Sequence, residues 1–281
     1  LEMKEDFKVY WNNFSIAKLQ KGKDYLTPDI ELIIDDMVEI KDRNKLKVFI
    51  EKWIKDKINT ELESLIKLKN VKNGNPEIRA LAYNLYENNG VVKREEVKVI
   101  LDKLQQEQRK ILREIGVKFG RYHIFLYKLF KPSTVSLRIL LWKNYFQKYY
   151  NLTPPVFGLN YFDNKYKSNK DFMLLCGFEN FGNIYVRIDI LERLFIIILN
   201  SNSKSSNNEK KEVKLTPEML NLLGCNKTNF AKLLQKMGYK TFERDKDLYF
   251  KYIAAKKQFN KKRNIYISDG PFSKLAELTN K

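Results

Sequence analysis

The sequence predicts an α+β fold that is mostly helical, and three observations support this prediction. Apolar residues recur at helical spacing over long stretches, short runs of β-branched and aromatic residues lie between them, and Gly, Pro and Asn mark the boundaries. The chain has 281 residues, of which 43% are hydrophobic, so it can bury a core and hold more than one unit. We expect a small N-terminal β unit, a helical bundle with a short β element, and a C-terminal winged-helix-like unit.

Residues 1–40 are predicted to form the small β unit. Phe7, Val9 and Trp11 alternate along a first strand, and the pair Asn12-Asn13 marks a turn. Residues 16–19 give a second short strand and residues 30–34 give a third. The alternative is a β appendage that only extends the neighbouring domain.

Residues 41–150 are predicted to form a helical domain with a central basic segment. Apolar residues recur every three or four positions over 42–69, and Asp42 is the expected N-cap of this helix. Pro76 suits the first position of a second helix, because proline lacks the N–H that is unpaired there. A third helix is expected over about 94–115.

The central basic segment, residues 115–145, is the stretch around which we expect the rest of the chain to pack. Its strand-forming residues are interrupted by Gly120. Pro132 then blocks any element that would run through it, and Ser133 or Thr134 is expected to cap a new helix. No acidic residue occurs in this segment, so it supplies both core residues and uncompensated positive charge.

The C-terminal half is divided by loop-like composition. The run NSNSKSSNN has the low complexity of a flexible loop or domain boundary. After it, two short helices and a hairpin resemble a winged-helix unit, whose second helix commonly docks on nucleic acid. The predicted division is a linker plus strand–helix unit at 151–200, a flexible loop at 201–214, the winged-helix-like unit at 215–255 and a basic tail at 256–281.

The charge balance points to a polyanionic partner. Lysine and arginine total 53 against 34 acidic residues, a formal net charge of +19. Such an excess favours nucleic acid first and an acidic membrane surface second. The alternative is that richness in Lys and Asn only reflects an AT-biased genome. The longest apolar run, residues 194–199, is far shorter than the roughly 18 residues that a membrane span requires, so we expect no membrane span.

The sequence lacks the patterns of the common catalytic and cofactor sites. It has two cysteines, Cys176 and Cys225, and one histidine, His123, too few for a Cys/His zinc site. We expect free, buried thiols, as in a cytoplasmic protein or, alternatively, one of the mitochondrial matrix. No phosphate-binding loop and no dinucleotide-binding turn occurs, so we expect no cofactor, no metal and no enzymatic activity.

Three acidic residues in one stretch allow a weaker alternative. Glu179, Asp189 and Glu192 could be assembled into the site of a divergent metal-dependent nuclease. We favour the interpretation that Glu192-Arg193 joins Arg187 and Asp189 in a structural ion-pair cluster.

The order of several short segments resembles one known family. The most specific piece is Gly116-Val117-Lys118-Phe119-Gly120, followed by Phe125, Lys131-Pro132, Leu137-Arg138 and Leu141-Trp142. The pattern is completed by the stretch 186–194 (VRIDILERL) and by Leu222-Leu223-Gly224-Cys225 with Met237-Gly238-Tyr239. The chain resembles, over about residues 8–252, the region C-terminal to the ATPase core in bacterial superfamily 2 DExH-type helicases related to the mitochondrial RNA-degradosome helicase. The resemblance implies an accessory module that guides single-stranded nucleic acid leaving a helicase core. This chain has none of the nucleotide-binding motifs, so helicase activity does not carry over to it.

Our first hypothesis is therefore a non-catalytic nucleic-acid-binding region, monomeric and with RNA favoured over DNA as partner. Cations would hold phosphates and aromatic rings would stack on bases, although we expect Phe125 to lie in the core. A second hypothesis is a scaffold that recruits a nuclease or a ribosome-associated partner. The residues expected to contact nucleic acid are Lys118, Arg121, Tyr122, Lys128, Lys131, Lys227, Lys232, Lys236, Lys256, Lys257, Lys261, Lys262 and Arg263.

Overall fold

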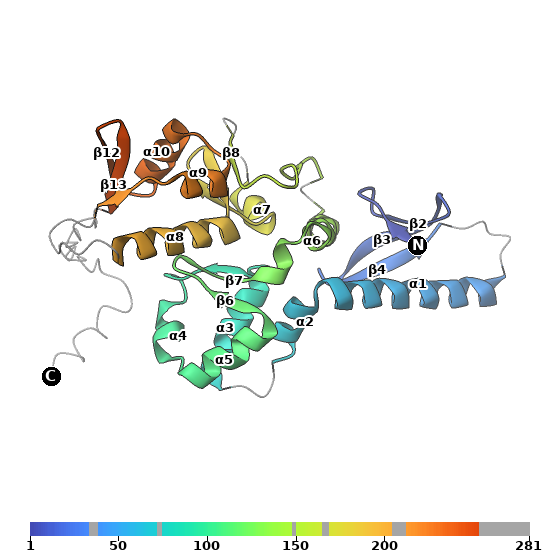
Figure 1. Ribbon diagram of the computed structural model, residues 1–281. Helices are drawn as coiled ribbons and strands as arrows, with labels where there is room; N and C mark the ends of the chain where they lie inside the picture. Colours follow the sequence, from blue (N-terminus) through green and yellow to red (C-terminus); the bar gives the residue numbers. More distant parts are fainter. Residues whose placement is uncertain (34–38, 72–74, 148–149, 165–168, 204–211, 253–281) are drawn as a thin grey trace, which may run out of the picture.

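The computed structural model describes residues 1–33, 39–71, 75–147, 150–164, 169–203 and 212–252. Within these ranges it has ten α-helices, one 3-10 helix and thirteen short strands in four sheets (Figure 1). The predicted fold class, α+β and mostly helical, is confirmed. None of the described helices combines the length and apolarity that crossing a membrane requires.

The N-terminal unit is an antiparallel sheet of four strands in chain order: β1 (Glu2–Met3), β2 (Lys8–Trp11), β3 (Phe14–Asp24) and β4 (Thr27–Leu32). Asn12 and Asn13 both have positive φ and form the two-residue turn between β2 and β3, as predicted. Helix α1 (Ile40–Glu61) packs on this sheet and extends beyond it (Figure 1). Its buried residues Ile50, Ile54 and Ile58 recur every four positions, which places them on one face.

Two long helices predicted from periodicity are each interrupted in the structure. The predicted helix 42–69 breaks at the buried Leu62 into α1 and α2 (Glu63–Lys69), and the N-cap of α1 is Glu39 rather than Asp42. The helix expected over 94–115 breaks at Leu104, which is extended, into α4 (Lys98–Lys103) and α5 (Gln106–Ile115). The helix between them, α3 (Pro76–Glu87), has proline at its first position as predicted.

The central basic segment forms a hairpin followed by a helix. Strands β6 (Val117–Phe119) and β7 (His123–Leu126) pair across a turn at Gly120–Tyr122, and β5 (Val91–Lys93) completes the sheet. After the 3-10 helix η1 (Tyr127–Phe130), helix α6 (Pro132–Phe146) begins with Pro132 at its first position and Lys131 as N-cap. The prediction that Ser133 or Thr134 caps this helix was therefore wrong. Both hydroxyls instead bond to Glu61 of α1, at 2.9 and 3.4 Å.

The second half of the chain contains two further sheets. The first consists of β8 (Tyr161–Asp163), β10 (Ile184–Arg187) and β9 (Phe178–Phe181) in that spatial order, so a strand lies within the predicted linker. It is flanked by α7 (Lys170–Leu175) and by α8 (Ile188–Ser203). The second belongs to the winged-helix-like unit, which comprises β11 (Val213–Lys214), α9 (Pro217–Leu223), α10 (Lys227–Lys236), β12 (Tyr239–Arg244) and β13 (Asp247–Tyr252).

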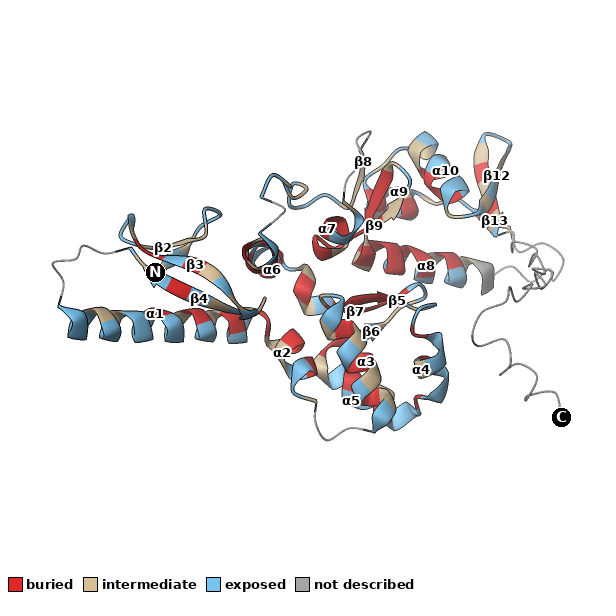
Figure 2. Ribbon diagram, turned by 180° about the vertical axis from the view of Figure 1, so that it is seen from behind, coloured by how far each residue is buried: buried red, intermediate tan, exposed pale blue. Residues whose placement is uncertain are grey.

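Hydrophobic cores cross the predicted unit boundaries. The first core joins the N-terminal sheet to α1–α5, the β6–β7 hairpin and one face of α6, so the described residues up to 146 form one half of the molecule. The second core packs α8 against β10 and the winged-helix-like unit. The other face of α6 packs on α7, β9 and β10 and joins the two halves. Figure 2 shows the resulting contrast between the buried α8 and the exposed end of α1.

Candidate nucleic-acid interface

A cleft of about 700 Å³ opens where the two halves meet. The first half contributes the end of β5 and the Gly120–Tyr122 turn, and the second half contributes β9, α8 and the hairpin β12–β13. Cationic and aromatic side chains share its wall, which gives the cleft both phosphate-binding and ring-stacking groups. The lining residues used below are Lys93, Arg94, Arg121, Tyr122, His123, Glu179, Phe181, Phe195, Tyr239, Lys251 and Tyr252.

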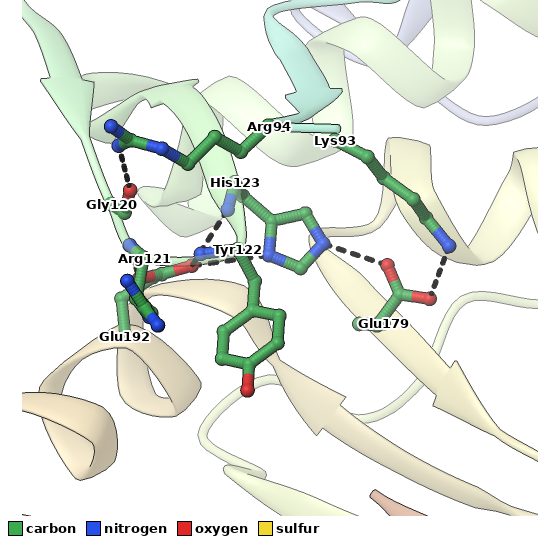
Figure 3. Close-up of polar contacts among 8 residues, drawn as sticks. All are labelled: Lys93, Arg94, Gly120, Arg121, Tyr122, His123, Glu179 and Glu192. Carbon is green, nitrogen blue, oxygen red and sulfur yellow. Dashed lines mark hydrogen bonds and ion pairs between the residues drawn. The ribbon is translucent and has the colours of Figure 1, made fainter. Parts of the chain in front are cut away.

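The floor of the cleft is a buried histidine held between two carboxylates (Figure 3). His123 of β7 is 2% exposed. Its Nε2 lies 2.7 Å from Oε2 of Glu179 on β9, and its Nδ1 lies 3.3 Å from Oε1 of Glu192 on α8. Lys93 of β5 donates to the other Glu179 oxygen at 3.0 Å. This Glu–His–Glu cluster therefore ties the first half of the molecule to the second.

Glu192 also binds the backbone of the turn above it. Its carboxylate accepts the consecutive N–H groups of Arg121, Tyr122 and His123, the latter two at 2.9 and 2.8 Å. Gly120 leaves room for this approach. A Cβ there would lie 2.6 Å from the His123 carbonyl oxygen and against the Glu192 carboxylate. The turn thus satisfies a buried carboxylate with backbone donors, which is the environment such a charge needs.

The charges in the Glu–His–Glu cluster shift the pKa of His123 and that of Glu179. Burial alone would lower the pKa of His123, but the hydrogen bonds with Glu179 and Glu192 outweigh burial and raise it. Burial would raise the pKa of Glu179, but His123 and Lys93 together lower it. The proton on His123 is therefore held to higher pH than it would be on an isolated histidine.

The geometry favours a structural joint with a binding surface over an acid–base centre. Both ring nitrogens of His123 face carboxylates, so neither is directed at a ligand in the cleft. Asp189 is engaged by Arg187 at 2.7 and 3.0 Å. Across the described ranges, no three His, Cys, Asp or Glu side chains converge as metal ligands.

The structure brings together only part of the predicted nucleic-acid surface. Arg121 and Tyr122 both line the cleft. Lys118 is exposed and lies 5.1 Å from the ring centroid of Tyr127, Lys128 pairs with Glu63 at 3.4 Å, and Lys131 is exposed at the start of α6. These three lie outside the cleft lining.

The predicted contacts of helix α10 also lie outside the cleft lining. Lys227 pairs with Glu243 at 2.7 Å and Lys236 donates to Asn183 at 2.5 Å, whereas Lys232 is exposed. The winged-helix-like unit therefore faces the cleft through its hairpin. The predicted tail contacts, Lys256, Lys257, Lys261, Lys262 and Arg263, fall outside the described residues.

Two interpretations of individual residues change. The predicted ion pair of Arg187 with Asp189 is present, but placing Glu192 in the same cluster was wrong, because Glu192 faces inward to the turn while Arg193 is exposed. Tyr122 is only partly free for stacking. Its ring centroid lies 4.0 Å from that of Phe195. Phe125 is 5% exposed and lies in the core, as expected.

Sequence reasoning missed most of the cleft. The missed residues come from segments far apart in the chain, and the sequence around each of them is that of an ordinary surface residue. They are Lys93, Arg94, Tyr239, Lys251 and Tyr252. The only local signal was the acid-free central segment, which supplied Arg121 and Tyr122. Comparison of the chain with protein-family models, curated proteins and solved structures gives no match.

Proposed function

We propose that this chain is a non-catalytic accessory region that binds single-stranded nucleic acid in the cleft between its halves, with RNA favoured over DNA. The observation that carries the proposal is the composition of the cleft wall. Its lining has four cationic side chains (Lys93, Arg94, Arg121 and Lys251) against two carboxylates (Glu95 and Glu179), together with tyrosine and phenylalanine rings. Cations bind the phosphates of a strand, and aromatic rings stack on its bases whatever their sequence.

The size and shape of the cleft favour a single strand over a duplex. A volume of about 700 Å³ is that of a pocket for a small ligand or for one or two nucleotides. Bases in a duplex are stacked on one another and cannot reach rings inside a pocket, whereas unpaired bases can be splayed out. Tyr252 is the most exposed of the cleft tyrosines at 59%, and its ring packs at an angle against that of Tyr239, with the centroids 5.3 Å apart.

The resemblance to helicase accessory regions fits this role. Such a region would receive a strand leaving a helicase core, which makes a helicase core or a nuclease the expected protein partner. A monomer in the cytoplasm, or alternatively in the mitochondrial matrix, satisfies the proposal. Catalysis is not part of it, because the histidine in the cleft has both nitrogens engaged by carboxylates.

Fluorescence anisotropy with labelled RNA tests the proposal. We expect the chain to bind single-stranded RNA in the absence of ATP. It should bind single-stranded DNA less tightly, and duplex RNA least tightly of the three. The slope of log affinity against log salt should be about −0.7 for each phosphate contact. Arg121→Ala and Lys251→Ala should each reduce that slope by about 0.7. The matched control is Lys232→Ala, an exposed lysine outside the cleft lining, which should leave both affinity and slope unchanged.

Two results would contradict the proposal. One is the absence of binding at low salt, which would make the net charge of +19 a feature of composition alone. The other is an equal loss of affinity in the Lys232 and Arg121 variants, which would mean diffuse attraction by the whole surface rather than binding in the cleft.

A further inference from the structure

We propose that Glu192 is the positioning residue of the cleft. From α8 in the second half, it holds the Gly120–Tyr122 turn of the first half so that Arg121 faces the ligand. This inference rests on the proposed function and adds a form of regulation to it, because strand binding then depends on the docking of the two halves.

The Glu192 carboxylate accepts hydrogen bonds mainly from backbone N–H groups. Glu192 is 6% exposed and receives three consecutive N–H groups from residues about 70 positions away in the chain. A carboxylate that only balanced charge would require no particular backbone conformation from its partner. Three successive amides can converge on one anion only when the turn has a concave shape, so the carboxylate selects that shape.

The opposite side of the turn is fixed as well. Arg94 donates from Nη1 to the Gly120 carbonyl oxygen at 2.8 Å, and the Gly120 N–H donates to the His123 carbonyl oxygen at 2.8 Å. Phe195, one helical turn after Glu192 on α8, lies against the ring of Tyr122. Helix α8 therefore holds residues 121–123 with the Glu192 carboxylate, which Figure 3 shows, and with the ring of Phe195.

Arg121 is the group whose placement depends on this arrangement. Its backbone N–H is bound by Glu192, while its side chain is exposed and lines the cleft. If the turn lost its shape, the guanidinium would remain on the protein but would no longer be directed into the cleft. Removing Glu192 should therefore have the same effect on binding as removing Arg121, and removing both should add little.

A double-mutant cycle tests the inference with single-stranded RNA as the probe. Each phosphate contact contributes about 0.7 to the slope of log affinity against log salt. At 0.1 M salt, one decade below 1 M, loss of one contact therefore weakens binding by about fivefold. We expect about this loss in Glu192→Gln, in Arg121→Ala and in the double variant alike. The salt slope should fall by about 0.7 in all three.

The matched control is Asp189→Asn, three residues before Glu192 on the same helix. Its carboxylate pairs with Arg187 and has no contact with the turn, so affinity and salt slope should equal those of the wild type. Glu192→Asp keeps the charge on a shorter side chain and should recover part of the affinity lost in Glu192→Gln.

A second measurement covers the case in which the Glu192 variants fail to fold. In the wild-type chain, saturating RNA should slow hydrogen exchange at the amides of residues 121–123, because bound ligand favours the docked turn. Independent losses, in which the double variant is weakened by the product of the single effects, would overturn the inference alone, as would unchanged exchange at these amides. A wild-type chain that binds neither RNA nor DNA would overturn the proposed function, and this inference with it.

Discussion

At the scale of the residue, both ring nitrogens of His123 are held by carboxylates. An imidazolium between two buried carboxylates is stable only because each group supplies the charge that the other needs in a site of low polarity. Arg138 shows another solution to the same problem. It is fully buried, its guanidinium donates to the carbonyl oxygens of Asn89 and Leu129 at 2.8 Å each, and burial lowers its pKa to about 10. A basic residue in an acid-free segment can therefore be structural, which composition alone does not reveal.

The raised pKa of His123 predicts a pH dependence of folding. A group whose pKa is higher in the folded state stabilises it below the unfolded pKa, near 6.5, and loses this contribution as pH rises through the folded pKa. Glu179 has a lowered pKa, so its contribution is present above about 4.5 and is lost as pH falls further. The difference in unfolding free energy between wild type and His123→Gln should thus peak near pH 6, at about 2 kcal/mol. Urea unfolding from pH 4 to 9 measures it, and a pH-independent difference would refute this account.

At the scale of the element, the sequence predicts what local chemistry decides. The Asn12-Asn13 turn and the proline start of α3 are confirmed because positive φ and a missing N–H are properties of those residues themselves. No glycine or proline marks the helix breaks at Leu62 and Leu104. Both leucines are buried, and we attribute the two breaks to their tertiary packing. The three residues of β8 are strand only because β10 lies beside them. Sequence patterns cannot register such pairings before the fold is known.

The β6–β7 turn gives a prediction at this scale. Gly120→Ala should lower the free energy of unfolding by about 2 kcal/mol, because the added methyl overlaps the Glu192 carboxylate and the His123 carbonyl in a packed site. Gly224→Ala is the matched comparison. That glycine has φ of 68° and no atom within 4 Å of an added Cβ, so it carries only the backbone cost of about 1 kcal/mol. Thermal and urea unfolding of both variants measure the difference. Equal stabilities for Gly120→Ala and the wild type would show that the Glu192 carboxylate does not require the space left by the missing Cβ of Gly120.

At the scale of the whole molecule, helix α6 packs against both halves of the chain. Leu137 and Leu141 on one face belong to the first core, and Val135, Ile139 and Trp142 on the other belong to the packing against α7, β9 and β10. The cleft takes Arg121 from one half and Lys251 from the other, so it is complete only while the halves stay docked. The α6 joint, the packing of Ile188 with Phe125 and the Glu–His–Glu cluster all contribute to this docking. This also explains why sequence reasoning found only one side of the cleft. Lys251 of the second half becomes part of the site only through packing between segments more than 100 residues apart.

The chain therefore predicts a distinct behaviour for Trp142→Ala. This side chain is 7% exposed and packs near Phe172 of α7, so its removal should destabilise the joint by about 3 kcal/mol. The two remaining tryptophans, Trp11 and Trp53, both lie in the first half, so fluorescence of the variant reports on that half alone, whereas circular dichroism reports on both. We expect the two urea transitions to coincide in the wild type and to separate in the variant. RNA affinity should fall as well, because the cations of the two halves would no longer face one cleft.

The control is Ile54→Ala, which creates a cavity within the first core. It should destabilise the chain while both transitions stay coincident. Coincident transitions in Trp142→Ala would mean that contacts other than the α6 joint hold the halves together, with the Glu–His–Glu cluster the first to be tested.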